Sequence, residues 1–107
     1  MTKKRHTLVW TGPALRNLLE AVQHIKMDKP VAAKRFGKQI KEKTSRLTQF
    51  PNSGRIVPEF SVSSLREIIV GDYRIIYRIL STKRQVEILT VFHGAKSMDV
   101  EHQPRGI

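Results

Sequence analysis

Two apolar runs joined by a two-residue turn constrain the fold of this chain more than any other feature. The runs at 65–70 and 73–80 are rich in Ile, Val and Tyr, and Gly71-Asp72 separates them. A two-residue loop that starts with Gly is typical of a tight β-hairpin. A third run of the same kind, at 86–93, follows a longer polar turn. The sequence therefore predicts a three-stranded antiparallel meander in the latter part of the chain.

Side chains of the middle strand alternate between the two faces of the predicted sheet. One face receives Tyr73, Ile75, Tyr77 and Ile79, and the other receives Arg74, Ile76, Arg78 and Leu80. Both faces are partly apolar, so both have something to bury. We expect a helical layer to cover one face, and we predict that the face with the two arginines is the exposed working surface.

Two amphipathic helices are predicted before the meander. The first begins after Gly12-Pro13 with Thr11 as its cap, and the second begins near Pro30 with Asp28 as its cap. The apolar positions recur three and four residues apart. In the first helix they are Leu15, Leu18, Leu19, Val22 and Ile25, and in the second they are Ala33, Phe36, Ile40 and Leu47. The pattern indicates a helical hairpin.

The predicted fold class is α+β, with the element order β-α-α-β-β-β. A short strand at 7–10 comes first and is free to join the sheet beside the last strand. Turn-forming residues over 50–64 predict a long loop between the second helix and the meander. We expect one domain over 1–107, a helical hairpin packed on a small, mainly antiparallel four-stranded sheet, and a flexible tail at about 97–107.

The charge of the chain points to a partner of opposite sign. Its formal net charge is +11, from 20 Lys and Arg against 9 Asp and Glu. Nucleic acid, the ribosome, an anionic membrane face and an acidic protein all fit, because the attraction is long-ranged. The second helix is especially basic, and its outer face is either simply solvated or meets phosphate or an acidic chain. Its cations are Lys34, Arg35, Lys38, Lys41, Lys43 and Arg46, against the single acid Glu42.

Several classes of protein are disfavoured by composition. The chain has no cysteine, which excludes disulfides, thiolate metal sites and a cysteine nucleophile. The basic start lacks the apolar stretch of a signal peptide, and no apolar run approaches the roughly 20 residues of a membrane span. We therefore expect a soluble cytoplasmic protein with no membrane partner, no cofactor and no metal.

Three segments, in this order and spacing, resemble the RelE/ParE toxin superfamily. They read FPNSGRIVPE at 50–59, LREIIVGDYRIIYRI at 65–79 and VEILTVFHGAK at 86–96. The resemblance implies a toxin of a type II toxin-antitoxin system, of the kind that inhibits growth and stabilises plasmids. It further implies a cognate antitoxin with an acidic, partly disordered tail, and contact with operator DNA only through that antitoxin.

The superfamily has two branches with different targets, because RelE-like members cut messenger RNA in the ribosome and ParE-like members inhibit DNA gyrase. Arg74 matches the arginine that ribonuclease members use on the phosphate, and His93 matches a histidine that some use as an acid or base. Glu67 is either a base, as in some relatives, or an ion-pair partner across strands. The lysine pair of the RelE type is missing at 65–67, and the terminal aromatic is missing after His93.

The resemblance to the ParE-like branch is closer. Shared features are Phe-Pro-x-x-Gly-Arg, Arg-Glu before the hairpin, Tyr-Arg-Ile-Ile-Tyr, and His-Gly followed by a basic residue. We therefore predict a gyrase inhibitor without catalytic residues. One alternative is a RelE-like endoribonuclease that uses Arg74, His93 and Glu67, and another is an inactive or regulatory antitoxin-binding protein. The candidate partner-binding residues are Arg55, Arg66, Tyr73, Arg74, Tyr77, Arg78, His93 and Lys96.

Overall fold

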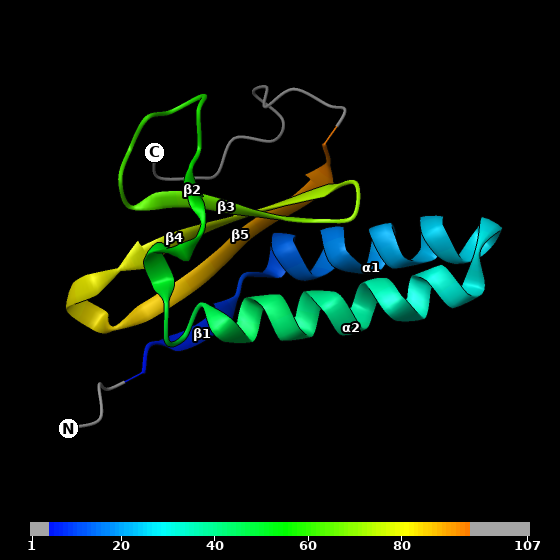
Figure 1. Cartoon of the computed structure of the whole chain (residues 1–107), viewed down its shortest axis with the longest axis horizontal. Helices are drawn as coiled ribbons and strands as arrows, with labels where there is room; N and C mark the ends of the chain where they lie inside the picture. The colour runs from blue at the N-terminus through cyan, green and yellow to red at the C-terminus, as the bar shows by residue number, and fades with distance from the viewer. Residues whose placement is uncertain (1–4, 95–107) are drawn as a thin grey trace.

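A five-stranded sheet carries two antiparallel helices on one face (Figure 1). The structure is a computed structural model, and it describes residues 5–94. The helices are α1 (Gly12–Asp28) and α2 (Pro30–Arg46). The strands are β1 (Thr7–Trp10), β2 (Arg55–Ile56), β3 (Leu65–Val70), β4 (Tyr73–Leu80) and β5 (Gln85–His93), with short 3-10 turns at Pro51–Ser53 and Ser81–Lys83. The predicted α+β class is confirmed, and the predicted elements follow one another in the predicted order with β2 added between α2 and β3.

The strands lie in the order β1-β5-β4-β3-β2. β1 pairs with β5 in parallel, as expected for a first strand beside the last, and every other pairing is antiparallel. The predicted count of four strands is wrong, because β2 adds a fifth. Arg55 and Ile56 pair with Glu67 and Arg66 of β3, so part of the predicted 50–64 loop is regular strand.

The helical hairpin is confirmed, with two corrections. Thr11 caps α1 by accepting a hydrogen bond from the Ala14 amide at 3.3 Å. Asp28 does not cap α2: it is the last residue of α1, and Lys29 alone separates the helices. Leu15 and Leu19 are 47% and 66% exposed, because α1 turns its small residues, among them Ala14, toward the core.

The main core fills the space between the helices and the sheet. Phe36 and Ile40 of α2, predicted as buried, are there, with Tyr73, Ile75 and Tyr77 of β4 opposite them. Ala33 and Leu47, the other two apolar positions predicted for this helix, are buried as well. The apolar stripe of α2 is therefore confirmed.

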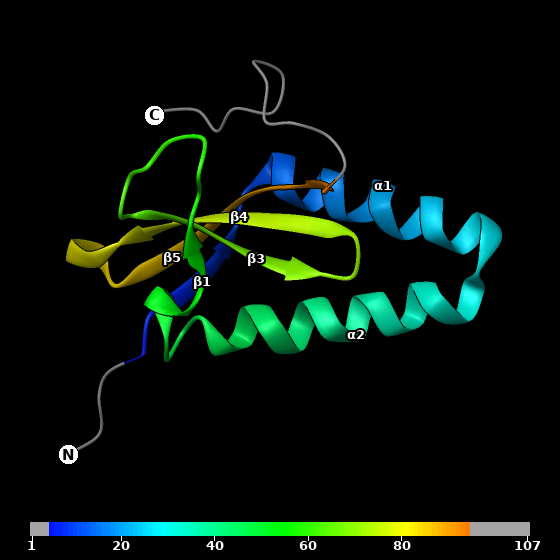
Figure 2. The same ribbon diagram turned by 45° about the horizontal axis from the view of Figure 1, so that its top comes forward.

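The other face of the sheet is not exposed, and that prediction is wrong. The loop between β2 and β3 rises on the side away from the helices (Figures 1 and 2). Its Val57 is buried there in a second, smaller apolar cluster, with Phe60 packed against it. The remaining members are Leu65, Ile76, Leu89 and Phe92. A sheet that is apolar on both faces needs two covers, and this loop is the second.

A bulge in β5 fixes α1 to the sheet. Ile76 pairs with Thr90 and Tyr77 pairs with Ile88, so Leu89 is the extra residue. The side-chain oxygen of Asn17 in α1 accepts hydrogen bonds from the Thr90 hydroxyl at 2.9 Å and the Val91 amide at 3.3 Å. Across residues 5–94, neither helix combines the length and apolarity that a membrane span requires.

Phe36→Ala and Ile40→Ala are each expected to lower the free energy of unfolding by about 2–5 kcal/mol, because each leaves a cavity between α2 and the sheet. Leu19→Ala is the matched control: its side chain is exposed, and the change should cost about 0.5 kcal/mol or less. Denaturant unfolding measures all three. Parent-like unfolding of both α2 variants would show that this face of α2 is not buried.

Candidate functional site

Arg74 of β4 is enclosed by two carboxylates. Its Nη1 and Nη2 donate to the two carboxylate oxygens of Glu59 at 2.7 and 2.8 Å. Its Nε and Nη2 donate to Glu67 at 2.6 and 2.9 Å. Glu59 comes from the loop after β2, and Glu67 comes from β3. Arg74 itself is 8% exposed, so its guanidinium is turned to the protein rather than to solvent.

Glu67 receives arginines from two sides. Besides Arg74, the Nε of Arg55 donates to its Oε1 at 3.0 Å, and β2 places Arg55 directly opposite Glu67. The Glu67 side chain is fully buried, whereas that of Arg55 is 62% exposed. Of the two alternatives given above, base or cross-strand ion-pair partner, this geometry is that of the ion-pair partner.

The surroundings of Arg74 favour its charged form. The hydrogen bonds that Arg74 donates to Glu59 and then to Glu67 raise the pKa of Arg74 above its ordinary value, against the opposing effect of burial. The ring of Phe92 adds a cation-π contact, with its centroid 5.1 Å from the guanidinium carbon. Arg74 is therefore a permanently charged link between the sheet and the loop that covers it.

His93 projects from the opposite face of the sheet. In the β4–β5 register Arg74 pairs with Phe92 and Tyr73 pairs with His93, and neighbouring residues of a strand point to opposite faces. The His93 ring meets the edge of Tyr73 at 5.3 Å between centroids. Arg74 and His93 both border a hollow beside Gly94 at the end of the sheet, but they approach it from different faces. The structure thus brings Arg74 and Glu67 together and leaves His93 apart.

Tyr73 and Tyr77 lie in the core, and neither presents a ring to a partner. Tyr73 packs against Phe36 at 5.1 Å between ring centroids. The Tyr77 hydroxyl donates to the Pro51 carbonyl at 2.6 Å and accepts from the Gly54 amide at 2.9 Å. A Cβ on Gly54 would lie 2.5 Å from that hydroxyl, so Gly54 is needed for space. Burial raises the pKa of Tyr77, as expected for a hydroxyl held in its neutral form.

Of the remaining predicted candidates, Arg66 and Arg78 make contacts within the protein, and Lys96 lies outside the described residues. Arg66 donates to the carbonyls of Asn52 and Gly54 at 3.1 and 3.0 Å, which fixes the turn after α2. Arg78 pairs with Glu87 across β4 and β5 at 2.8 Å. Lys96 and the tail predicted at 97–107 lie outside the described residues.

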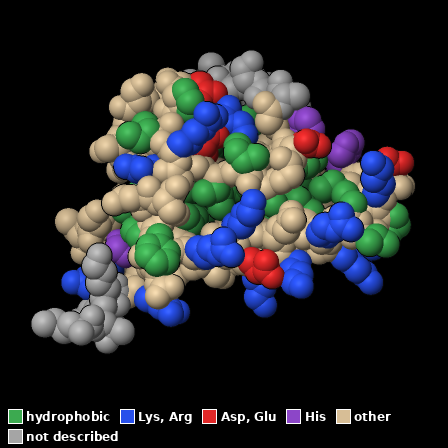
Figure 3. Space-filling model, viewed as in Figure 1, with side chains coloured by type: hydrophobic (Ala, Val, Ile, Leu, Met, Phe, Trp, Pro, Cys, Tyr) green, Lys and Arg blue, Asp and Glu red, His purple; other side chains and the backbone are tan. Residues whose placement is uncertain are grey.

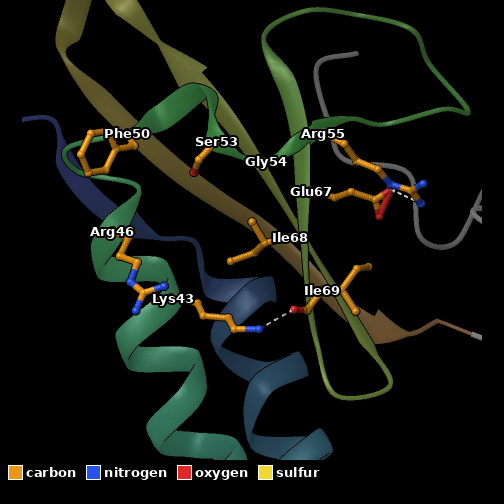
Figure 4. Close-up of a pocket in the computed structure, with 9 residues that line it drawn as sticks. All are labelled: Lys43, Arg46, Phe50, Ser53, Gly54, Arg55, Glu67, Ile68 and Ile69. Carbon is orange, nitrogen blue, oxygen red and sulfur yellow. Dashed lines mark hydrogen bonds and ion pairs between the residues drawn. The ribbon is translucent and has the colours of Figure 1, made fainter.

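A groove of about 400 Å³ lies between the end of α2 and the edge of β3 (Figure 4). Lys43 and Arg46 come from α2, Phe50 from the following turn, and Ile69 from β3. β2 pairs with β3 only at Glu67 and Arg66, so no described strand covers the edge beside Ile69. Lys43 reaches over instead and donates its Nζ to the Ile69 carbonyl at 3.2 Å.

Apolar side chains stand exposed beside these cations. Phe50 is 61% exposed and Ile69 is 46% exposed. The groove therefore combines an open strand edge, apolar surface and positive charge, which together suit an extended acidic segment with apolar side chains.

Sequence reasoning missed the groove and missed Glu59. Each has a weak local signal: Phe50 is a large apolar residue at the start of a polar loop, and Glu59 is the single acid of that loop. Neither signal says which strand the loop meets. Among residues 5–94, no group of His, Asp or Glu side chains has an arrangement that could hold a metal ion.

Comparison with known proteins finds a family model that covers most of the chain. A family model described as the ParE toxin of the type II toxin-antitoxin system parDE matches residues 8–98. No curated protein matches the chain in sequence.

Similar solved structures come from both branches of the superfamily. The chain is similar to a chain of the chromosomal ParDE system from P. aeruginosa, with a TM-score of 0.68 and 21% identity over 85% of this chain and 98% of that one. It is similar to a chain of the RelBE2 complex from Mycobacterium tuberculosis, with a TM-score of 0.59 and 22% identity over 83% and 98%. The isolated E. coli RelE toxin gives a TM-score of 0.60 and 18% identity over 86% and 87%. Identities this low establish the fold alone.

Arg74→Met is expected to lower the free energy of unfolding by about 3–5 kcal/mol, because it leaves Glu67 buried with one of its two arginines gone. Arg78→Met on the same strand is the matched control. Its ion pair with Glu87 is partly exposed, so its loss should cost about 1 kcal/mol or less. Equal unfolding energies for the two variants would contradict a structural role for the Arg74 network.

Proposed function

This chain belongs to the ParE toxin family of type II toxin-antitoxin systems, and we propose that it inhibits DNA gyrase in the cytoplasm until a cognate antitoxin covers it. The observation that favours gyrase over messenger RNA as the target is the enclosure of Arg74 by Glu59 and Glu67. Ribonuclease chemistry of the RelE kind needs a cation that is free to stabilise the pentavalent phosphate. Here four hydrogen bonds to carboxylates occupy the guanidinium.

The remaining parts of a ribonuclease site are also poorly placed. A general base needs an accessible carboxylate within hydrogen-bond reach of the ribose hydroxyl, whereas Glu67 is fully buried between Arg55 and Arg74. His93 projects from the other face of the sheet. An RNA phosphate would have to displace Glu59 and expose β4 before reaching Arg74. A protein that acts by binding gyrase needs none of these steps.

We further propose that the antitoxin lies in the groove between α2 and the edge of β3. A segment that folds as it binds gains affinity by burying apolar side chains over a large surface. Phe50 and Ile69 offer the apolar surface, and Lys43, Arg46 and Arg55 offer charge for its carboxylates. The net charge of +11 speeds the capture of an acidic chain.

Purified protein is expected to block supercoiling by gyrase and to accumulate cleaved DNA. In ribosome-bound assays of translated messages it should leave the RNA intact, because Arg74 is withheld from the phosphate. Codon-dependent cuts that disappear in a folded His93→Ala variant would contradict the proposal and identify an endoribonuclease. If folded protein shows neither activity, the inactive or regulatory alternative is favoured.

Phe50→Ala is expected to weaken the complex with the cognate antitoxin. Losing a buried Phe side chain costs about 1.5–3 kcal/mol, which is roughly a 10- to 150-fold weaker Kd. Leu19→Ala is the control, since Leu19 is equally exposed but lies on α1. Titration calorimetry with each variant measures the effect. An unchanged Kd for Phe50→Ala, or equal losses in both variants, would place the antitoxin elsewhere.

A further inference from the structure

The outer face of α2 is strongly positive. Six of its exposed side chains are cations, and Glu42 is its one exposed acid. The cations are Lys34, Arg35, Lys38, Lys41, Lys43 and Arg46. Figure 3 shows Lys and Arg side chains gathered along the edge of the molecule that α2 forms. We call the five cations other than Lys43 the α2 cationic face, because Lys43 is engaged with the Ile69 carbonyl.

Structural explanations account for only part of this charge. Lys43 and Arg46 stand in the last turn of α2, where cations interact favourably with the helix dipole. Lys34, Lys38 and Lys41 stand further from that end. Their spacing of three and four residues places them side by side, and like charges at that spacing destabilise a helix. Within residues 5–94, no ion pair involves a side chain of α2. This cluster of charge therefore opposes the folding of α2 instead of supporting it.

We propose that the α2 cationic face binds the phosphate backbone of double-stranded DNA. The face runs straight from Lys34 to Arg46, a rise of about 18 Å at 1.5 Å per residue. A duplex carries one phosphate per about 1.7 Å of its axis, so roughly ten phosphates lie within that length. The surface thus presents a line of positive charge to a ligand with a matching line of negative charge.

The chemistry of this face argues against two other polyanionic partners, an acidic peptide and a membrane surface. Beyond Pro30 and Val31 in the first turn, every exposed side chain of α2 is polar or charged. An acidic peptide that folds on binding needs apolar contacts, which the Phe50–Ile69 groove has and this face does not. A helix that lies on a membrane gains much of its binding from an inserted apolar face, but the apolar face of α2 is buried in the core. The choice of DNA over RNA rests on the proposed action at gyrase.

Such contacts carry no sequence information, because phosphates are the same at every base pair. The face would therefore hold the protein on any duplex, including the DNA that gyrase has bound. It adds an interaction beyond the one between the protein and gyrase itself.

The test is the salt dependence of binding to a fluorescent DNA duplex of about 24 base pairs, measured by anisotropy with the full chain and without gyrase. Five phosphate contacts give a slope of about −4.5 in log affinity against log salt, so affinity should fall roughly 500-fold between 50 and 200 mM NaCl. The variant Lys34→Gln/Lys38→Gln/Lys41→Gln keeps two contacts, and its affinity should fall only about tenfold over the same range.

The matched control is Arg16→Gln/Lys26→Gln/Lys83→Gln, which removes the same charge from exposed positions on α1 and in the β4–β5 turn. It should keep the parent slope. Equal slopes for the two triple variants would overturn the proposal, since the binding would then follow net charge alone. Tighter binding of the parent protein to the matching RNA duplex would also overturn it. So would a triple α2 variant that no longer binds polyglutamate but still binds DNA as the parent does.

The binding assay contains no gyrase, so the two proposals fail separately. Protein that binds the duplex through α2 but leaves supercoiling unaffected would contradict the proposed function and leave this inference standing.

Discussion

The link between Arg74 and the carboxylates of Glu59 and Glu67 holds together the side of the sheet that faces away from the helices. It ties the central strand to its neighbour and to the loop that covers the second apolar face. A buried arginine is tolerated because both carboxylates pair with it, and removal of one partner would leave an uncompensated buried charge. The same link withholds the guanidinium from any external phosphate. One interaction therefore holds the covering loop on the sheet and occupies the arginine that a ribonuclease of this fold would need.

The fold occurs in chains of both ParDE and RelBE systems, so the function has to be argued from the surfaces. This chain has two distinct ones. The groove beside β3 joins apolar side chains to cations, while the outer face of α2 carries cations with hardly any exposed apolar surface. The first suits a peptide that folds as it binds, and the second suits a phosphate backbone. The two surfaces meet at Arg46, which borders the groove and also ends the α2 cationic face.

Local patterns predicted most of the elements, and tertiary contacts decided the rest. Alternation and turn chemistry located β3 and β4 with their observed bounds, and the spacing of Phe36 and Ile40 gave the buried face of α2. Leu15 and Leu19 fit the same spacing in α1, but Ala14 and Ala21 face the core more directly. β2 was missed because a strand of two residues is too short to show an alternating pattern of apolar and polar side chains. Arg74 was recognised from its resemblance, yet its burial depends on Glu59, which lies 15 residues away along the chain.

The most direct test is an NMR measurement of the arginine Nε–H groups while a short RNA oligonucleotide is added. The account predicts that the Arg74 Nε–H, bonded to Glu67 at 2.6 Å, exchanges slowly with water and keeps its chemical shift as RNA is added. Exposed Arg55 provides the internal comparison. A shift or loss of protection at Arg74 on adding RNA would show that the guanidinium leaves its carboxylates for phosphate, and it would contradict the account.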